Sequence, residues 1–135
     1  MAEPATPAMD LTGGAEQLST QQVVDALGRD VDGVELAALL TPEHRVVAAS
    51  TATSEQRAHD VVAAAADLAG AAAAVARAVG DVDGDLPDTV VEVGAGTLMV
   101  LGLGQGRCLV TLVSPLGNID DVVDHMAGAV ERLGL

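Results

Sequence analysis

A run of acidic residues in the second half of the chain comes nearest to the pattern of a metal site. Asp81, Asp83, Asp85 and Glu92 stand at positions 1, 3, 5 and 12 of a calcium-binding loop. Such a loop turns sharply at a glycine in position 6, where this chain has Leu86. We therefore expect a solvated acidic loop and no metal ion.

Other groups capable of chemistry are present without a productive spacing. His44, His59 and His125 fall in a turn and in two separate predicted helices, so they lack the spacing of metal ligands. The glycine-rich segment 102–106 leads into a predicted strand, which offers no helix N-terminus to the phosphates of a dinucleotide. The serines stand outside any nucleophile-elbow context. The sequence predicts no catalytic residue and no cofactor.

Composition narrows the possible partners. The 135 residues include six arginines, no lysine and 20 acidic residues, a formal charge of −14, and they include no Phe, Tyr or Trp. Such a chain repels nucleic-acid phosphates and anionic lipid and has no ring to stack on a base, so we expect no nucleic acid partner. The acidity either attracts a basic partner or reflects solvation in a salty cytosol or a biased genome. The absence of lysine beside many Ala, Gly and Arg residues favours the second, compositional interpretation.

The ends of the chain and its cysteine bear on domain organisation and location. Residues 1–16 contain Glu3, Asp10 and no cation, a composition typical of a disordered acidic tail, and residues 17–135 are long enough for a single domain. The tail lacks the positive and apolar regions of a secretory signal. The lone Cys108 is expected to be a core residue in a reducing compartment. We expect a cytoplasmic protein.

Turn and capping signals predict the elements that must position any site. A capping box at Ser19 opens a helix that ends at Gly33, a second one at Thr53 opens a long helix to about Val79, and Asn118 caps a last helix. Apolar runs of strand length occupy 34–40, 46–51, 89–93, 97–103 and 108–114. The connections inside the first pair and the last three are short, which makes those strands antiparallel.

The long helix is apolar on both sides. One stripe suits the face of a sheet and consists of Val61, Ala65, Leu68, Ala72, Val75 and Val79. The opposite side carries small residues, namely Ala63, Ala66, Gly70, Ala73 and Ala74. A helix that is apolar all round is normally buried on more than one side, so these small residues predict close helix packing in a homodimer. One alternative is an alanine-rich helix on the protein surface. The other is a membrane span, which is disfavoured because the apolar stretch is short and contains Asp67.

The chain resembles the Roadblock/dynein light-chain family, whose members are small dimeric regulators of Ras-like GTPases. The resemblance lies in the order of the elements and in three strand-turn patterns, Val90–Val93, Leu98–Val110 and Ser114–Ile119. The resemblance covers residues 17–135. The chain departs from the family pattern in the first hairpin, where members often carry an Asp-Gly turn and this chain has Glu43-His44-Arg45.

The resemblance implies an α+β fold, a three-layer α/β/α sandwich. Its five-stranded antiparallel sheet has the order 2-1-5-4-3, with the long helix on one face and the terminal helices on the other. It also implies a homodimer that pairs the long helices and joins the third strands, which adds Thr89, Val91 and Val93 to the expected interface. The expected function is a regulator that binds a small Ras-like GTPase and modulates its GTP hydrolysis or localisation, with no chemistry of its own. One alternative is a purely structural scaffold without effect on hydrolysis. A third possibility is an enzyme or small-molecule sensor that uses a pocket in a profilin-like fold, which the lack of aromatic residues disfavours.

A regulator of GTP hydrolysis can supply an arginine to the transferring phosphoryl group. The candidates are Arg45 in the first hairpin, Arg57 at the start of the long helix and Arg107 after the glycine-rich turn. Each is equally a solvating or ion-pairing arginine, and Arg57 has Asp60 and Glu55 as possible partners on its own helix.

Overall fold

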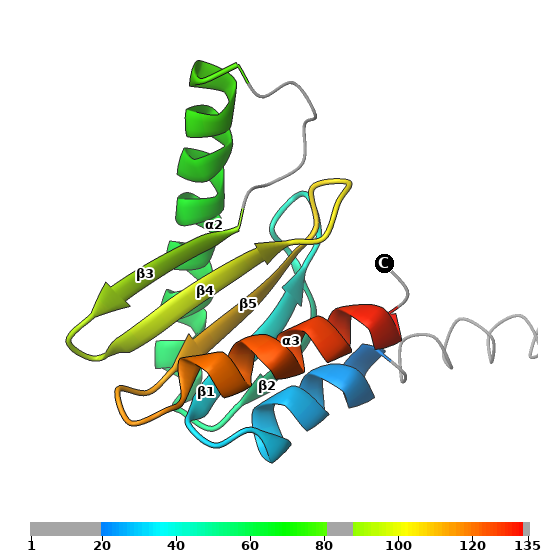
Figure 1. Cartoon of the computed structure of the whole chain (residues 1–135), viewed down its shortest axis with the longest axis vertical. Coiled ribbons are helices and arrows are strands. Elements are labelled where there is room, and N and C mark those ends of the chain that lie inside the picture. Colours follow the sequence, from blue (N-terminus) through cyan, green and yellow to red (C-terminus); the bar gives the residue numbers. More distant parts are fainter. Residues whose placement is uncertain (1–19, 81–87, 134–135) are drawn as a thin grey trace, which may run out of the picture.

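A computed structural model describes residues 20–80 and 88–133, which form two helical layers around one sheet (Figure 1). The elements in chain order are a first helix over residues 20–30, β1 (Val34–Leu40), β2 (Val46–Thr51), α2 (Glu55–Ala78), β3 (Thr89–Val93), β4 (Gly96–Gly102), β5 (Cys108–Val113) and α3 (Ile119–Leu133). All four strand pairs are antiparallel, in the order β2-β1-β5-β4-β3. The predicted three-layer sandwich is confirmed. The tail 1–16 and residues 81–85 of the acidic loop lie outside the described residues.

Strand boundaries follow the turn residues closely. β1, β2 and β3 begin and end where the apolar runs predict. β4 begins one residue early, at Gly96, because Val93 and Gly96 already pair across the two-residue turn that joins β3 to β4. Gly96 has φ +148°, and a side chain there would collide with the carbonyl oxygen of Val113. The meander of the last three strands is confirmed.

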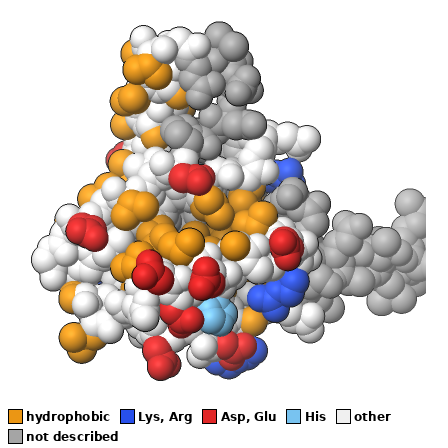
Figure 2. All heavy atoms as spheres, in the orientation of Figure 1, with side chains coloured by type: hydrophobic (Ala, Val, Ile, Leu, Met, Phe, Trp, Pro, Cys, Tyr) orange, Lys and Arg blue, Asp and Glu red, His pale blue; other side chains and the backbone are white. Residues whose placement is uncertain are grey.

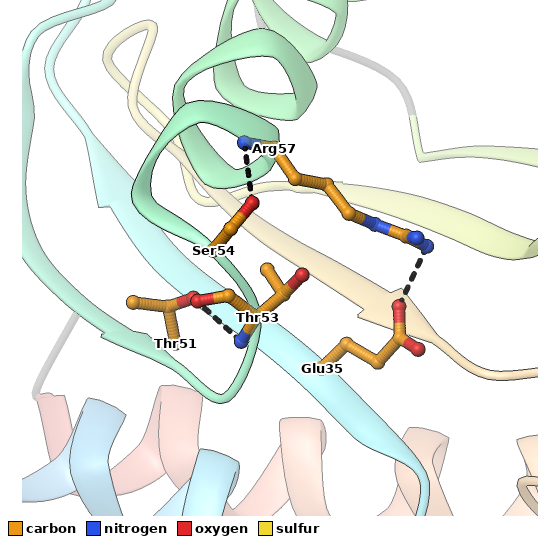
Figure 3. Close-up of polar contacts among 5 residues, drawn as sticks. All are labelled: Glu35, Thr51, Thr53, Ser54 and Arg57. Atoms are coloured by element: carbon orange, nitrogen blue, oxygen red, sulfur yellow. Dashed lines mark hydrogen bonds and ion pairs between the residues drawn. The ribbon is translucent and has the colours of Figure 1, made fainter.

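The cap of α2 lies one residue later than predicted. The Ser54 hydroxyl accepts a hydrogen bond from the backbone N–H of Arg57 at 3.2 Å, so Ser54 is the N-cap and the prediction of Thr53 is wrong (Figure 3). Thr53 instead closes the preceding turn, since its N–H donates to the Thr51 hydroxyl at 3.2 Å. Two adjacent hydroxyl residues are suited to the cap, and the turn after β2 decides between them.

The other helix ends are consistent with their signals. Asn118 Oδ1 accepts from the Asp121 N–H at 3.2 Å, which confirms the predicted cap of α3. The first helix ends at residue 30, and the chain then turns through Gly33, whose φ of +90° is left-handed. Ser19, the predicted cap of that helix, lies outside the described residues.

The core consists of two aliphatic clusters, one on each face of the sheet. Under α3 and the first helix it contains Val24, Leu27, Leu109, Val113, Val122 and Met126, and under α2 it contains Ala38, Leu40, Ala65, Ala69, Val100, Cys108 and Val110. Cys108 is fully buried as predicted, and burial raises the pKa of its thiol, so the group stays protonated and unreactive at neutral pH.

The predicted sheet stripe of α2 is only partly correct. Ala65 is buried and Val61 and Leu68 are half-buried, but Val75 and Val79 are 62% and 77% exposed, so their predicted place on the sheet is wrong. The reason is length. A helix of 24 residues spans about 36 Å, whereas the longest strands, of seven residues, span about 23 Å. The C-terminal part of α2 therefore runs past the sheet (Figure 1).

Candidate functional site

The outer face of α2 is open. Of the small residues predicted to pack in a dimer, Ala63, Gly70 and Ala74 are exposed, while Ala66 and Ala73 are half-buried. A methyl group added to Gly70 would meet no described atom within 4 Å. This face therefore has room for the close approach of another backbone.

α2 as a whole buries little of its length. Ala65 and Ala69 are its two buried residues, and both pack on the sheet cluster that contains Val100 and Val110. Among the described helices, α2 alone is long and apolar enough to cross a membrane by length and composition. Its packing on the sheet accounts for one apolar side, and the described residues leave the other side exposed.

The predicted joining strand is an edge of the sheet. Within the described residues, β3 pairs with β4 and with no second strand. Val93 is 60% exposed, and Val91, which faces the α2 side beside Leu98, is half-buried. α2 crosses behind β3 and contacts it (Figure 1). The small-residue face of α2 and the β3 edge are thus neighbouring parts of one surface.

Two of the three candidate arginines lie at the same end of the sheet. Leu40 pairs with both Val46 and Cys108, which brings the turns that carry Arg45 and Arg107 together. The contact is tight, since a side-chain carbon on Gly106 would lie 3.0 Å from Cβ of Pro42 in the neighbouring turn.

Arg57 lies at the opposite end of the sheet. Its Nη2 is 2.9 Å from Oε2 of Glu35 near the start of β1, and the two side chains are 44% and 31% exposed (Figure 3). The expectation of a partner on its own helix is wrong, because the side chain reaches across to β1 and Gln56 donates to Asp60 instead. The three arginines therefore do not form one cluster.

The atypical first hairpin keeps a tight turn at a conformational cost. His44 has φ +63°, a left-handed conformation that favours glycine. Thr41 holds the turn, because its N–H donates to the Arg45 carbonyl at 2.9 Å and its hydroxyl accepts from the Arg45 N–H at 3.1 Å. The departure from the family pattern thus changes the side chains of this turn and leaves it closed.

No group of three or more His, Cys, Asp or Glu side chains suited to a metal occurs within residues 20–80 and 88–133. His125 lies on α3 with its Nδ1 2.8 Å from the Asp121 carbonyl oxygen, and His44 and His59 belong to a turn and to α2.

Sequence reasoning missed one surface, a groove of about 240 Å³ between β3, β4 and α3. Figure 2 shows hydrophobic side chains gathered in this hollow and acidic side chains around it. The available signal was the sequence of β3 and its lead-in, where Asp88, Val90 and Glu92 alternate with residues of the opposite face.

Comparison with solved structures agrees with this architecture. The Roadblock/LC7 domain from Streptomyces avermitilis is 23% identical with a TM-score of 0.72, and the alignment covers 84% of this chain and 93% of that one. The gliding protein MglB from Thermus thermophilus is 21% identical with a TM-score of 0.75 and 88% coverage of both chains. A structure of MglB with a tetrameric arrangement has the same identity and coverage and a TM-score of 0.74.

No curated protein matches the sequence. The family model of the Roadblock/LC7 domain, in contrast, matches residues 20–113, which run from the first helix to the end of β5 and make up more than half of the chain. This chain therefore belongs to the Roadblock/LC7 family.

Proposed function

We propose that the chain is a cytoplasmic homodimer that binds a small Ras-like GTPase and modulates its GTP hydrolysis or its localisation. The observation that carries the proposal is the open, apolar, small-residue face of α2 beside β3, the edge strand of the sheet that the described residues form. Membership of the Roadblock/LC7 family supports the regulatory role. The tetrameric arrangement of the similar MglB is consistent with self-association through this fold.

The physical case for the dimer rests on two neighbouring features. The alanines and Gly70 on the outer face of α2 permit helix axes to approach at the short end of the range of about 8–10 Å. An edge strand such as β3 is a template for pairing with another strand. A second copy related by a two-fold axis would cover both features at once, because the same patch serves both subunits.

The regulatory mechanism would be surface complementarity. Arg45 and Arg107 at one end of the sheet offer two cations to a bound GTPase, while Arg57 at the other end is held by Glu35. An arginine offered to the phosphoryl group would come either from the end with Arg45 and Arg107 or from Arg57 at the other end, since the three do not converge.

The dimer is tested by placing a charge on the open face. Ala74 is exposed, so Ala74→Glu fits the isolated chain, but in a helix–helix contact it would bury an unpaired carboxylate at a cost of several kcal/mol. We expect the dissociation constant of the dimer, measured by analytical ultracentrifugation, to rise about 100-fold or more. Ala52→Glu, in the exposed turn before α2, is the matched control. If the Ala74→Glu variant stays dimeric, the interface lies elsewhere. If the wild-type chain is monomeric at micromolar concentration, the dimer proposal is wrong.

The GTPase is tested by a pull-down from lysate of the source organism, with a GTP analogue in one arm and GDP in the other. Recovery of a small GTPase in one nucleotide state supports the proposal, and single-turnover hydrolysis with the purified pair then measures regulation. The double variant Arg45→Ala/Arg107→Ala is expected to weaken binding, with Arg29→Ala as a control because Arg29 pairs with its neighbour Asp30 on the surface. Binding without any effect on hydrolysis or localisation would favour the alternative of a structural scaffold.

A further inference from the structure

The groove between β3, β4 and α3 lies on the other face of the sheet from α2, beside the β3 edge that the proposed dimer would use. Its walls are β3 on one side and α3 on the other, and Met99 and Met126 form part of its floor. Val90 and Val123 line it at 55% and 45% exposure, so the groove opens onto the surface. It exists because the core cluster under α3 draws its strand residues from β1, β2, β4 and β5, which leaves β3 uncovered on this face.

The floor of the groove is fixed. Met126 is 3% exposed, and its Sδ accepts a hydrogen bond from the buried Thr111 hydroxyl at 3.0 Å. Val122, one residue before Val123, is fully buried in the same cluster. The helix is thus held against the sheet, and the groove does not depend on a loop.

Acidic residues stand at both ends of each wall. On β3, Val90 lies between Asp88, which lines the groove, and Glu92, which lies on the same face because strand side chains alternate. On α3, Asp120 and Glu131 lie in the helical row of Val123 and Ala127, at intervals of three or four residues. The chain runs antiparallel in the two walls, so each end of the groove receives a carboxylate from both sides (Figure 1).

No positively charged side chain of α3 lies beside these carboxylates. The helix has one arginine, Arg132, which falls on the side away from Val123 at 100° per residue. The carboxylate of Asp88 is oriented by the Gly102 N–H, which donates to its Oδ1 at 3.1 Å. An apolar floor between carboxylates selects an occupant that is apolar in the middle and positively charged at its ends.

We propose that this groove binds a short amphipathic segment of another protein, with one or two large apolar anchors between Lys or Arg residues. An apolar cavity of about 150 Å³ holds a benzene ring, so 240 Å³ accommodates an aromatic anchor. The chain has no aromatic residue and no lysine of its own, and a second copy would bring another charge of −14. The complementary chemistry must therefore come from a different protein.

A display selection tests the proposal without a known partner. Random 16-residue peptides are selected against the full chain, and the chemical-shift changes caused by the selected peptides are mapped. We expect enrichment of Lys and Arg around apolar anchors, and changes at Val90, Leu101, Val123 and Ala127, which line the groove. A selection without binders, binders without basic residues, or changes confined to other surfaces would overturn the proposal. In the Ala74→Glu variant, where the proposed dimer is weakened, shifts at the groove that respond to dilution of the protein alone would assign the groove to a second copy and also overturn the proposal.

Two variants with matched controls sharpen the test. Val123→Asp is expected to weaken binding of the selected peptides about tenfold or more, and Val47→Asp, at a similarly exposed valine of β2, is the control. Glu131→Lys should weaken them about fivefold at low salt with less effect at high salt, whereas Glu43→Lys in the β1–β2 turn makes the same change of net charge far from the groove. Equal effects of variant and control would contradict the assigned site. The Ala74→Glu variant should bind the peptides normally, which separates this proposal from the dimer.

Discussion

β5 and β3 belong to the same sheet and both consist mainly of aliphatic residues, but they have opposite environments. All six residues of β5 are buried, whereas none of the five residues of β3 is. β5 lies in the middle of the sheet between β1 and β4, with clusters from both helical layers on its faces, and β3 lies at the edge. Position in the sheet, more than composition, decides which aliphatic residues are buried within the chain and which stay exposed at its edge.

The helical layers repeat this contrast. α3 buries Val122, Met126 and Ala129 on one clear face and exposes charges on the other. α2 buries Ala65 and Ala69 and leaves an apolar outer face. The residues around β5 are covered within the single chain, while the surface formed by α2 and β3 leaves aliphatic residues exposed, as the proposed dimer requires.

Matched valine substitutions test the contrast most strongly. Val110 in β5 is fully buried and pairs with Val100, whereas Val90 in β3 is 55% exposed. Val110→Ala removes buried methyl groups and leaves a cavity, so we expect a loss of about 2–3 kcal/mol in the free energy of unfolding. Val90→Ala should cost about 0.5 kcal/mol. Urea denaturation at one protein concentration measures both, and equal losses would show that β3 is as well covered as β5.

Gly70→Ala tests whether the open face of α2 is an interface. In the isolated chain the added methyl group meets nothing, and replacing a helical glycine by alanine stabilises a helix by about 1 kcal/mol. In a close helix–helix contact the same methyl group would force the axes apart, so we expect the dimer dissociation constant to rise about tenfold. Thermal unfolding of the Ala74→Glu monomer background and ultracentrifugation of the dimer separate the two effects. An unchanged dissociation constant would remove Gly70 from the contact.

The sequence predicted the architecture well because its local signals are strong. The limits of β1, β2 and β3 were predicted from apolar runs flanked by turn residues, and the cap at Asn118 was also correct. The strand order came from a family resemblance, since periodicity carries no information on which strands pair.

The wrong predictions concern contacts that depend on how far apart two elements lie in the folded chain. Val75 and Val79 have the correct helical periodicity for the sheet, but the sheet is shorter than α2. Arg57 has acidic neighbours on its own helix, but Glu35 of β1 is the residue that it meets. The groove combines β3, β4 and α3 and has no local pattern of its own beyond alternation in β3. Such features follow only from packing, which the sequence pattern does not encode residue by residue.

A substitution in the β1–β2 hairpin is expected to change stability by a smaller amount. His44 is in the left-handed region at φ +63°, which costs a side chain with a Cβ about 1 kcal/mol or more. Because glycine adopts this conformation freely but loses more entropy on folding, His44→Gly should raise the free energy of unfolding by about 0.5–1 kcal/mol. Chemical denaturation measures the change, and Glu43→Gly, one residue earlier, is the control that should not stabilise. A destabilised His44→Gly would mean that the imidazole makes contacts that offset the backbone cost.

The ion pair at the other end of the same sheet gives the smallest expected effect. Arg57 and Glu35 approach to 2.9 Å with both side chains partly exposed, so solvent screens the attraction and the lost side-chain entropy opposes it. A double-mutant cycle with Arg57→Ala and Glu35→Ala should give a coupling free energy of about 0.5 kcal/mol or less, which falls further in 1 M salt. A coupling above about 2 kcal/mol that persists in salt would show that this corner is shielded from water. Arg57 would then be a buried structural residue and would no longer be a candidate for contact with a GTPase.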